Sequence, residues 1–119
     1  MGNYLKNHLN SNENFVHIYT DISKEDLGNK IDQLMFSSGY KRVVGQPGDG
    51  VYEKGNKTMR ILFGAFIKYF KFNVLTFTDE TNEIRVQVTK ESSGMSGGLI
   101  GIDQVKKELL RLAQIFSTI

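Results

Sequence analysis

The clearest periodic pattern in the chain is an apolar stripe in its N-terminal third. Four residues recur at intervals of three and four, the spacing of one face of an α-helix: Leu27, Ile31, Leu34 and Met35. Ser23 can cap this helix, with Asp26 completing a capping box, and Gly39 suits a left-handed residue at its C-terminal end. The pattern predicts a helix over about residues 24–38.

Short runs of β-branched and aromatic residues predict strands around this helix. The first run covers residues 15–19. Residues 40–44 and 51–54 flank a cluster of turn-forming residues that is typical of a hairpin. Residues 84–88 alternate between apolar and polar side chains, which indicates a strand with one face on solvent.

The segment from residue 58 to residue 72 fits two structures, because its apolar residues suit both buried strands and an amphipathic helix. We favour strands for two reasons. Gly64 would cost a helix interior about 1 kcal/mol, and Phe70, Phe72 and Val74 continue the segment with the period of two that a strand requires.

The end of the chain predicts a long helix that packs on the sheet. One face is apolar, with Asp103 as its N-cap, and most charged residues lie opposite, among them Glu108 and Arg111. The apolar positions are Val105, Leu109, Leu112, Ala113 and Phe116. A loop rich in glycine and serine, residues 92–101, precedes this helix.

These elements predict the α+β class. We expect two layers, with an antiparallel sheet of about five to six strands covered by an N-proximal helix and a long C-terminal helix, in the order β-α-β-β-β-β-β-α. A length of 119 residues suits one hydrophobic core, so residues 15–119 should form a single domain. Residues 1–14 are rich in asparagine and poor in branched apolar residues, and we expect a flexible N-terminal arm there.

The composition excludes several kinds of chemistry. The chain has no cysteine, which rules out disulfides and thiolate sites and suits a soluble, cytoplasmic protein. Its longest uncharged apolar run, residues 61–67, is far shorter than the roughly 20 residues of a transmembrane helix, so we expect no transmembrane segment. His8 and His17 show neither metal-site nor triad spacing. We predict no catalytic residue, metal site or cofactor, although His17, Asp21 and Ser93 or Ser96 could still assemble around a pocket.

Basic charge is concentrated in the middle of the chain, although the net charge is only +2. Residues 40–71 hold seven basic and two acidic residues, interleaved with aromatic side chains. If they share one sheet face, six candidates could bind phosphates and stack on a base: Lys54, Lys57, Arg60, Lys68, Tyr69 and Lys71. We prefer the simpler interpretation that the phenylalanines are core and the lysines their solvent-facing neighbours.

The glycine-rich loop is a second candidate, because backbone amides ahead of a helix can cradle an anion. The residues that would do so are Gly94, Ser96, Gly97, Gly98 and Gly101. The loop lacks the pattern of a P-loop or of a dinucleotide fingerprint, and Asp103 would repel a phosphate. We therefore favour a structural role for these glycines.

We expect a small non-enzymatic binding or interaction domain whose ligand the sequence does not reveal. One alternative is single-stranded nucleic acid or an anionic membrane surface, bound through residues 40–72. Another is a small apolar ligand held between the sheet and the C-terminal helix. A homodimer or another protein partner fits an exposed apolar edge in the same segment, and nucleic acid is not the favoured partner.

Overall fold

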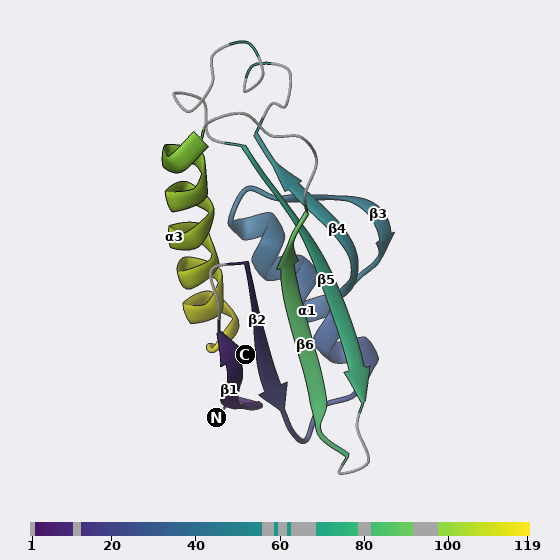
Figure 1. The fold of residues 1–119 in the computed structure, drawn as a ribbon. Helices are drawn as coiled ribbons and strands as arrows, with labels where there is room; N and C mark the ends of the chain where they lie inside the picture. The colour runs from purple at the N-terminus through teal and green to yellow at the C-terminus, as the bar shows by residue number, and fades with distance from the viewer. Residues whose placement is uncertain are drawn as a thin grey trace.

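The computed structural model of the protein describes residues 2–10, 13–55, 59, 62, 69–78, 82–91 and 98–119. These residues form a six-stranded antiparallel sheet with the order β1-β2-β6-β5-β4-β3, and the α+β class is confirmed (Figure 1). The elements in chain order are β1 (Tyr4–Asn10), β2 (Asn14–Tyr19), α1 (Lys24–Ser37), β3 (Lys41–Gln46), β4 (Asp49–Lys54), β5 (Phe70–Thr78), β6 (Ile84–Lys90) and α3 (Gly98–Phe116).

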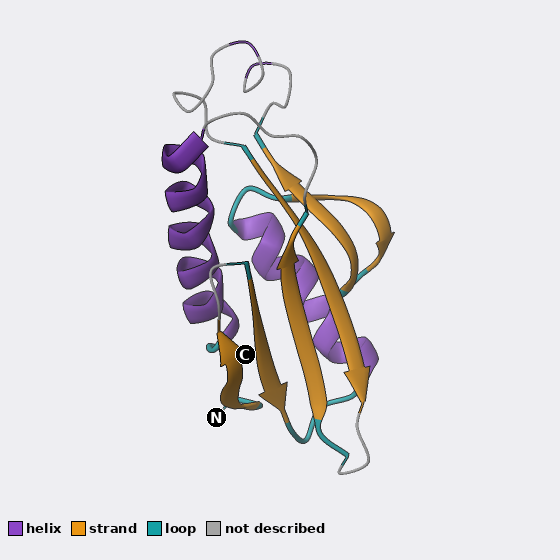
Figure 2. Ribbon diagram, viewed as in Figure 1, coloured by secondary structure: helices purple, strands orange, loops and turns teal. Residues whose placement is uncertain are grey.

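The two helices share one face of the sheet. Helix α1 crosses behind the strands β5 and β6, and α3 runs alongside β2 (Figure 2). One buried cluster joins both helices to the sheet, and its members include Phe15, Tyr52, Phe72, Val86, Leu27, Ile31, Met35, Leu109, Leu112 and Phe116. No helix in the described ranges covers the other face, which we call the open face.

Helix α1 begins and ends as its sequence predicts. The hydroxyl oxygen of Ser23 accepts a hydrogen bond from the backbone amide of Asp26 at 3.0 Å, which caps the first turn. Gly39 has a left-handed φ of +91°, and the amide of Tyr40 donates to the carbonyl of Met35 at 2.9 Å. This is the bond of a Schellman motif, and only glycine takes up that backbone conformation without strain.

The hairpin of β3 and β4 is also confirmed, and its turn docks on α1. The connection is Pro47-Gly48, with φ of +79° at Gly48. Gly28 of α1 lies so close that an added Cβ would stand 2.5 Å from the carbonyl oxygen of Pro47. Thr76 of β5 donates its hydroxyl to the carbonyl of Gly48 at 2.7 Å. Helix, turn and sheet are therefore tied together at this corner.

The N-terminal residues differ from our expectation of a flexible arm. Residues 4–10 form β1, which pairs antiparallel with β2 from Tyr4 to Asn10, with two irregularities in the register. The backbone amides of Asn3 and Tyr4 both donate to the carbonyl oxygen of Ile119, at 2.7 and 2.9 Å. An edge strand can be held by such backbone bonds although its side chains are polar. Two strands, not one, therefore precede α1, and within the described ranges four strands separate α1 from α3.

The expected strands of residues 58–72 are found only from Phe70 onward, where β5 begins. Met59 and Leu62 are helical, so the strand interpretation is wrong for these two residues. The others from 58 to 68 lie outside the described residues. Helix α3 begins at Gly98, which makes Asp103 an internal residue paired with Lys107 at 3.0 Å and not the N-cap that we predicted.

Candidate functional site

The sheet separates the predicted phosphate-binding residues. Lys71 of β5 lies opposite Glu53, and Lys54 of β4 lies opposite Phe70, so the two lysines point to opposite faces. The ammonium of Lys54 sits 5.6 Å from the ring centroid of Tyr40 on the helix-covered side. Three further candidates lie outside the described residues: Lys57, Arg60 and Lys68. The described lysines therefore do not form one basic surface.

Tyr69 is not placed to stack on a base, because its side chain is buried. Its hydroxyl donates to the carboxylate of Glu53. Burial, reinforced by this hydrogen bond, raises the pKa of Tyr69 above its ordinary value. Tyr69 therefore packs beside β4, outside the buried cluster that joins the helices to the sheet.

A second buried group joins α3 to the start of β3. The carboxylate of Glu108 accepts the hydroxyl of Tyr40 at 2.5 Å and two guanidinium bonds from Arg111, at 2.7 and 2.8 Å. Although burial opposes ionisation, these bonds and the charge of Lys54 hold the pKa of Glu108 below its usual value. Burial and the bond to Glu108 raise the pKa of Tyr40. Both carboxylate oxygens accept hydrogen bonds, so the group ties α3 to the start of β3.

His17 is likewise engaged on both sides of its ring. Its Nε2 lies 2.8 Å from the carbonyl oxygen of Ala113 in α3, and its Nδ1 lies 3.2 Å from the side-chain amide nitrogen, Nδ2, of Asn7 in β1. Burial lowers the pKa of His17. The ring therefore does not pair with Asp21, and the serines that could complete a catalytic group, Ser93 and Ser96, lie outside the described residues.

The candidate anion-binding loop lies only partly within the described residues. Gly94, Ser96 and Gly97 lie outside the described residues, whereas Gly98 and Gly101 belong to α3 and not to a loop. The prediction of a loop is therefore wrong for these two glycines. In the described part of the chain, no cluster of three or more histidine, aspartate or glutamate side chains could hold a metal ion.

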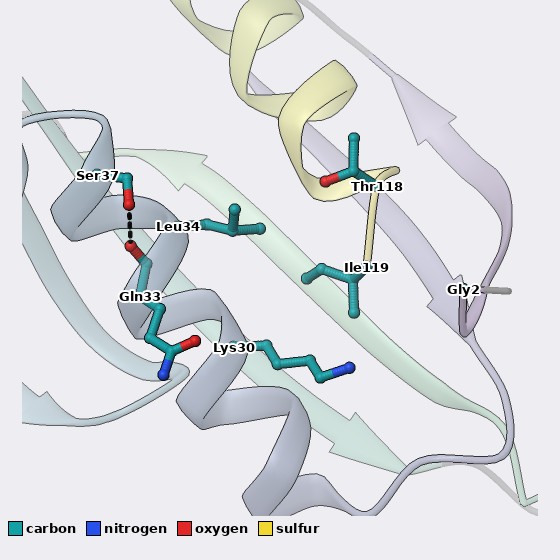
Figure 3. A pocket seen from close by; sticks show the side chains of 7 residues that line it. All are labelled: Gly2, Lys30, Gln33, Leu34, Ser37, Thr118 and Ile119. Carbon is teal, nitrogen blue, oxygen red and sulfur yellow. Dashed lines mark hydrogen bonds between the residues drawn. The ribbon is translucent and has the colours of Figure 1, made fainter.

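A cleft of about 580 Å³ lies on the helical side, between α1 and the segment that follows α3 (Figure 3). Lys30, Leu34 and Ile119 project into it, and its lining is completed by Gly2, Gln33, Ser37 and Thr118. The hydroxyls of Ser37 and Thr118 already donate to carbonyls of their own segments. A ligand site usually brings several polar groups to one point. Lys30 offers only a single charged group here.

The interior between α3 and the sheet is filled with side chains. Phe15 and Phe116 meet edge to face, with ring centroids 5.8 Å apart, and Leu112 is fully buried beside them. The hydroxyl of Tyr19 donates to the carbonyl of Phe116 at 2.7 Å. This packing explains how α3 is held, and it leaves the apolar-ligand alternative without support from the described contacts.

The open face is apolar where strands β5 and β6 meet. The side chains of Phe72 and Val74 are buried on the helix-covered side, whereas Leu75 and Phe77 point the other way and are 45% and 41% exposed. The register places Leu75 beside Gln87 and Phe77 beside Arg85 of β6. On β2, Val16 and Ile18 continue these two rows and are buried.

Charges of both signs lie on the same face, two outward rows from Leu75 along β5. Along one row, Lys41 of β3 pairs with Glu53 of β4, and Glu53 pairs with Lys71 of β5. The amide of Glu91 donates to the carbonyl of Lys71 at 2.9 Å, so an acidic residue ends the row. Lysine and glutamate therefore alternate across the sheet. Arg85 lies in the neighbourhood of Phe77.

The exposed pair Leu75 and Phe77 was not predicted, although the alternation of apolar residues along β5 indicates it. Phe70, Phe72 and Val74 occupy even positions of the strand, whereas Leu75 and Phe77 are odd. Apolar residues at both even and odd positions indicate a strand whose two faces are both apolar. Helices of the described ranges cover one of those faces, and Leu75 and Phe77 lie on the other.

No model of a protein family matches this chain, and no curated protein is significantly similar to it. None of the helices in the described ranges is long and apolar enough to cross a membrane.

Proposed function

We propose that this protein is a non-enzymatic interaction domain that binds another protein on the open face of its sheet. The observation that carries the proposal is the exposure of Leu75 and Phe77, neighbouring outward positions of β5, on a face without a covering helix in the described ranges. The wet face of an antiparallel sheet is usually polar. Contiguous exposed apolar side chains rimmed by polar ones are typical of protein contacts.

The charges of the open face favour a protein over a polyanion. Binding to a nucleic acid or an anionic membrane grows with the number of basic residues that face the phosphates. Here Glu53 and Glu91 lie next to Lys71, and Tyr69, the aromatic residue suited to stacking, is buried. A partner protein would instead match an apolar centre with a rim of mixed charge.

Site-specific photo-crosslinking tests this proposal for a partner of any identity. The photoreactive amino acid p-benzoylphenylalanine replaces Phe77 in one variant and Phe36 in a control, since Phe36 is an equally aromatic, 63% exposed residue on α1. Both variants are irradiated in extracts of the cells that make the protein, and the adducts are identified by mass spectrometry. We expect one defined protein adduct at position 77 that is missing at position 36.

The chemical class of the adduct decides the outcome. A nucleic acid or lipid attached at position 77 would overturn the choice of a protein partner. Equal, unspecific labelling at positions 77 and 36 would show that the open face is not a specific binding surface. A defined protein adduct at position 77 alone supports the proposal, whether the attached protein is a second copy of this chain or a different protein.

A further inference from the structure

We infer that β1 is an edge strand that detaches from β2 when His17 is protonated, so that mildly acidic pH opens this edge of the sheet. The observation that carries the inference is the place of the imidazole, which lies between β1 and α3 and is hydrogen-bonded to both. The inference does not rest on the proposed function, because β2 and β6 separate β1 from the exposed residues of β5.

Strand β1 covers one side of the His17 ring, which is only 2% exposed. The side-chain amide nitrogen of Asn7 lies 3.2 Å from Nδ1 of the ring and donates to the carbonyl oxygen of Val16 at 3.4 Å. The ring of Tyr4 packs against the imidazole edge to face, with the centroids 4.8 Å apart. Departure of β1 would therefore bring water to Nδ1, while the bond from Nε2 to Ala113 of α3 could remain.

Protonation of the ring conflicts with the docked position of β1. The second proton is carried by Nδ1, where Asn7 presents a donor and an acceptor is needed. Turning the amide of Asn7 over would not remove the conflict, because its oxygen would then face the carbonyl oxygen of Val16, which accepts a hydrogen bond from it. The docked strand therefore favours the neutral ring.

The surroundings of the ring do not compensate a positive charge. The titratable groups packed against it are the phenols of Tyr4 on β1 and Tyr19 on β2, and phenols are neutral at mildly acidic pH. Strand β6 places Val86 beside His17, and α3 supplies the carbonyl of Ala113. Burial lowers the pKa of His17, and no charged side chain of the described residues contributes to that shift.

Hydration of the protonated ring costs less through β1 than through α3. Strand β1 forms the edge of the sheet, and its register with β2 is interrupted between Tyr4 and Lys6 and again between Asn7 and Leu9 (Figure 1). The side chains of residues 5–8 are exposed. Helix α3 is held in the core by the buried side chains of Leu109, Leu112 and Phe116. Because burial of large apolar side chains is a main source of stability, β1 is the element that gives way.

The pH dependence follows from the two protonation equilibria of His17. In the released state the ring is in water and its pKa returns towards the ordinary value of 6.5, whereas burial keeps the pKa of the docked ring lower. The docked strand is therefore fully favoured above pH 6.5 and loses this advantage as the pH falls towards the pKa of the docked ring. The ratio of released to docked strand can rise by at most about 25-fold between pH 7 and pH 5.

Amide hydrogen exchange followed by NMR tests the inference, with protection factors corrected for the effect of pH on the chemical rate of exchange. Two amides report on this edge. The amide of Tyr4 donates to the carbonyl of Ile119, and that of Thr20 donates to the carbonyl of Asn3, both at 2.9 Å. Both bonds break when the strand leaves, so their protection factors should fall by up to about 25-fold between pH 7 and pH 5.

Urea distinguishes release of the strand from unfolding of the whole chain. Exchange through a small opening depends weakly on urea, because little surface becomes exposed, whereas exchange through global unfolding depends on it steeply. Low urea concentrations should therefore accelerate exchange at Tyr4 and Thr20 much less than exchange of the amides that join β5 to β6.

Three variants assign the effect to the ring and to its contact with β1. His17→Gln is neutral across this range, so its protection factors should be the same at pH 7 and pH 5. Asn7→Asp places a carboxylate beside Nδ1 that pairs with the protonated ring, so the fall in protection should shrink or become a rise. His8→Gln removes the exposed histidine of β1 and should behave like the wild type.

Three results would overturn the inference. They are unchanged protection of the Tyr4 and Thr20 amides at pH 5, a fall of equal size in His17→Gln, and a urea dependence as steep as that of the amides between β5 and β6. If His17→Gln does not fold, Asn7→Asp decides, because a fall as large as in the wild type would show that the contact of Nδ1 with β1 is not the cause. None of these results changes the adduct expected at position 77.

Discussion

The imidazole of His17 illustrates how a single side chain joins distant parts of this chain. The carbonyl oxygen of Ala113 can only accept a hydrogen bond, so Nε2 carries the proton and Nδ1 accepts from the amide of Asn7. The ring packs against Tyr4 and Phe15, with centroids 4.8 and 4.7 Å away. A second proton, on Nδ1, would point at the N–H donor of Asn7 in a site with little water.

This arrangement predicts a loss of stability at mildly acidic pH. Burial lowers the pKa of His17 below its value of 6.5 in an unfolded chain. Its contribution to the free energy of unfolding is therefore complete above pH 6.5 and is lost as the pH falls through the folded pKa, by at most about 1.4 kcal/mol per pH unit. His17→Gln should flatten the pH dependence in urea titrations between about pH 7 and pH 5.

The other histidine provides the control for this prediction. His8 is exposed on β1, so His8→Gln should keep the pH dependence of the wild type. A His17→Gln variant that lost stability with falling pH as steeply as the wild type would show that other groups cause the effect.

Glu108 shows what the sequence could not provide at the scale of single residues. Its position in the helical pattern assigns it to the solvent face, as for most charged residues of α3. It is nevertheless only 8% exposed, because Tyr40, 68 positions earlier in the chain, and Arg111 bind its carboxylate. A contact over such a separation has no local signature in the sequence.

At the scale of elements, the sequence predicted the features that depend on residues adjacent in the chain. The capping residues of α1 and the turn residues of the β3–β4 hairpin lie next to the elements that they end or join. Strand β1 was not predicted, since it depends on pairing with β2 and on contacts with Ile119. The start of α3 was placed too late in the chain, because Gly98 and Gly101 are weak helix formers and the rest of the helix overrides them.

The end of α1 leads to a prediction for Gly39. An alanine there would be held at φ of +91°, which costs a residue with a side chain about 1 to 2 kcal/mol. Its added Cβ would also stand 3.2 Å from Cε of Lys54. Gly39→Ala should therefore lower the free energy of unfolding by about that amount in urea titrations followed by circular dichroism.

Ser38, the preceding residue, is the matched control. Its φ of −89° suits any residue, so Ser38→Ala should change the free energy of unfolding by no more than about 0.5 kcal/mol. If both variants were equally stable, the left-handed turn would not be what ends the helix.

At the scale of the whole molecule, the sequence predicted a sheet covered by helices but did not reveal that the helices of the described ranges cover one face of it. The helices supply apolar stripes for one face of the sheet, while β5 carries apolar residues on both of its faces. The candidate site arises from this imbalance. The basic residues of the middle segment were the more visible signal in the sequence, yet the register separates Lys54 from Lys71.

Two phenylalanines of β5 test whether the two faces have different roles. Phe72 is fully buried beneath the helices, and Phe77 is 41% exposed on the open face. Phe72→Ala should lower the free energy of unfolding by about 3 to 5 kcal/mol, because it leaves a cavity in the core. Phe77→Ala, measured at low protein concentration, should lower it by less than about 1 kcal/mol.

Adding the partner separates the two roles further. A bound partner stabilises the folded state by mass action, so the difference in stability between wild type and Phe77→Ala should grow as the partner concentration rises, whereas the cost of Phe72→Ala is already present in the free chain. If Phe77→Ala cost as much as Phe72→Ala in dilute solution, the side chain of Phe77 would already be covered within the monomer. The open face would then be part of the core, and neither a partner protein nor a second copy could bind there.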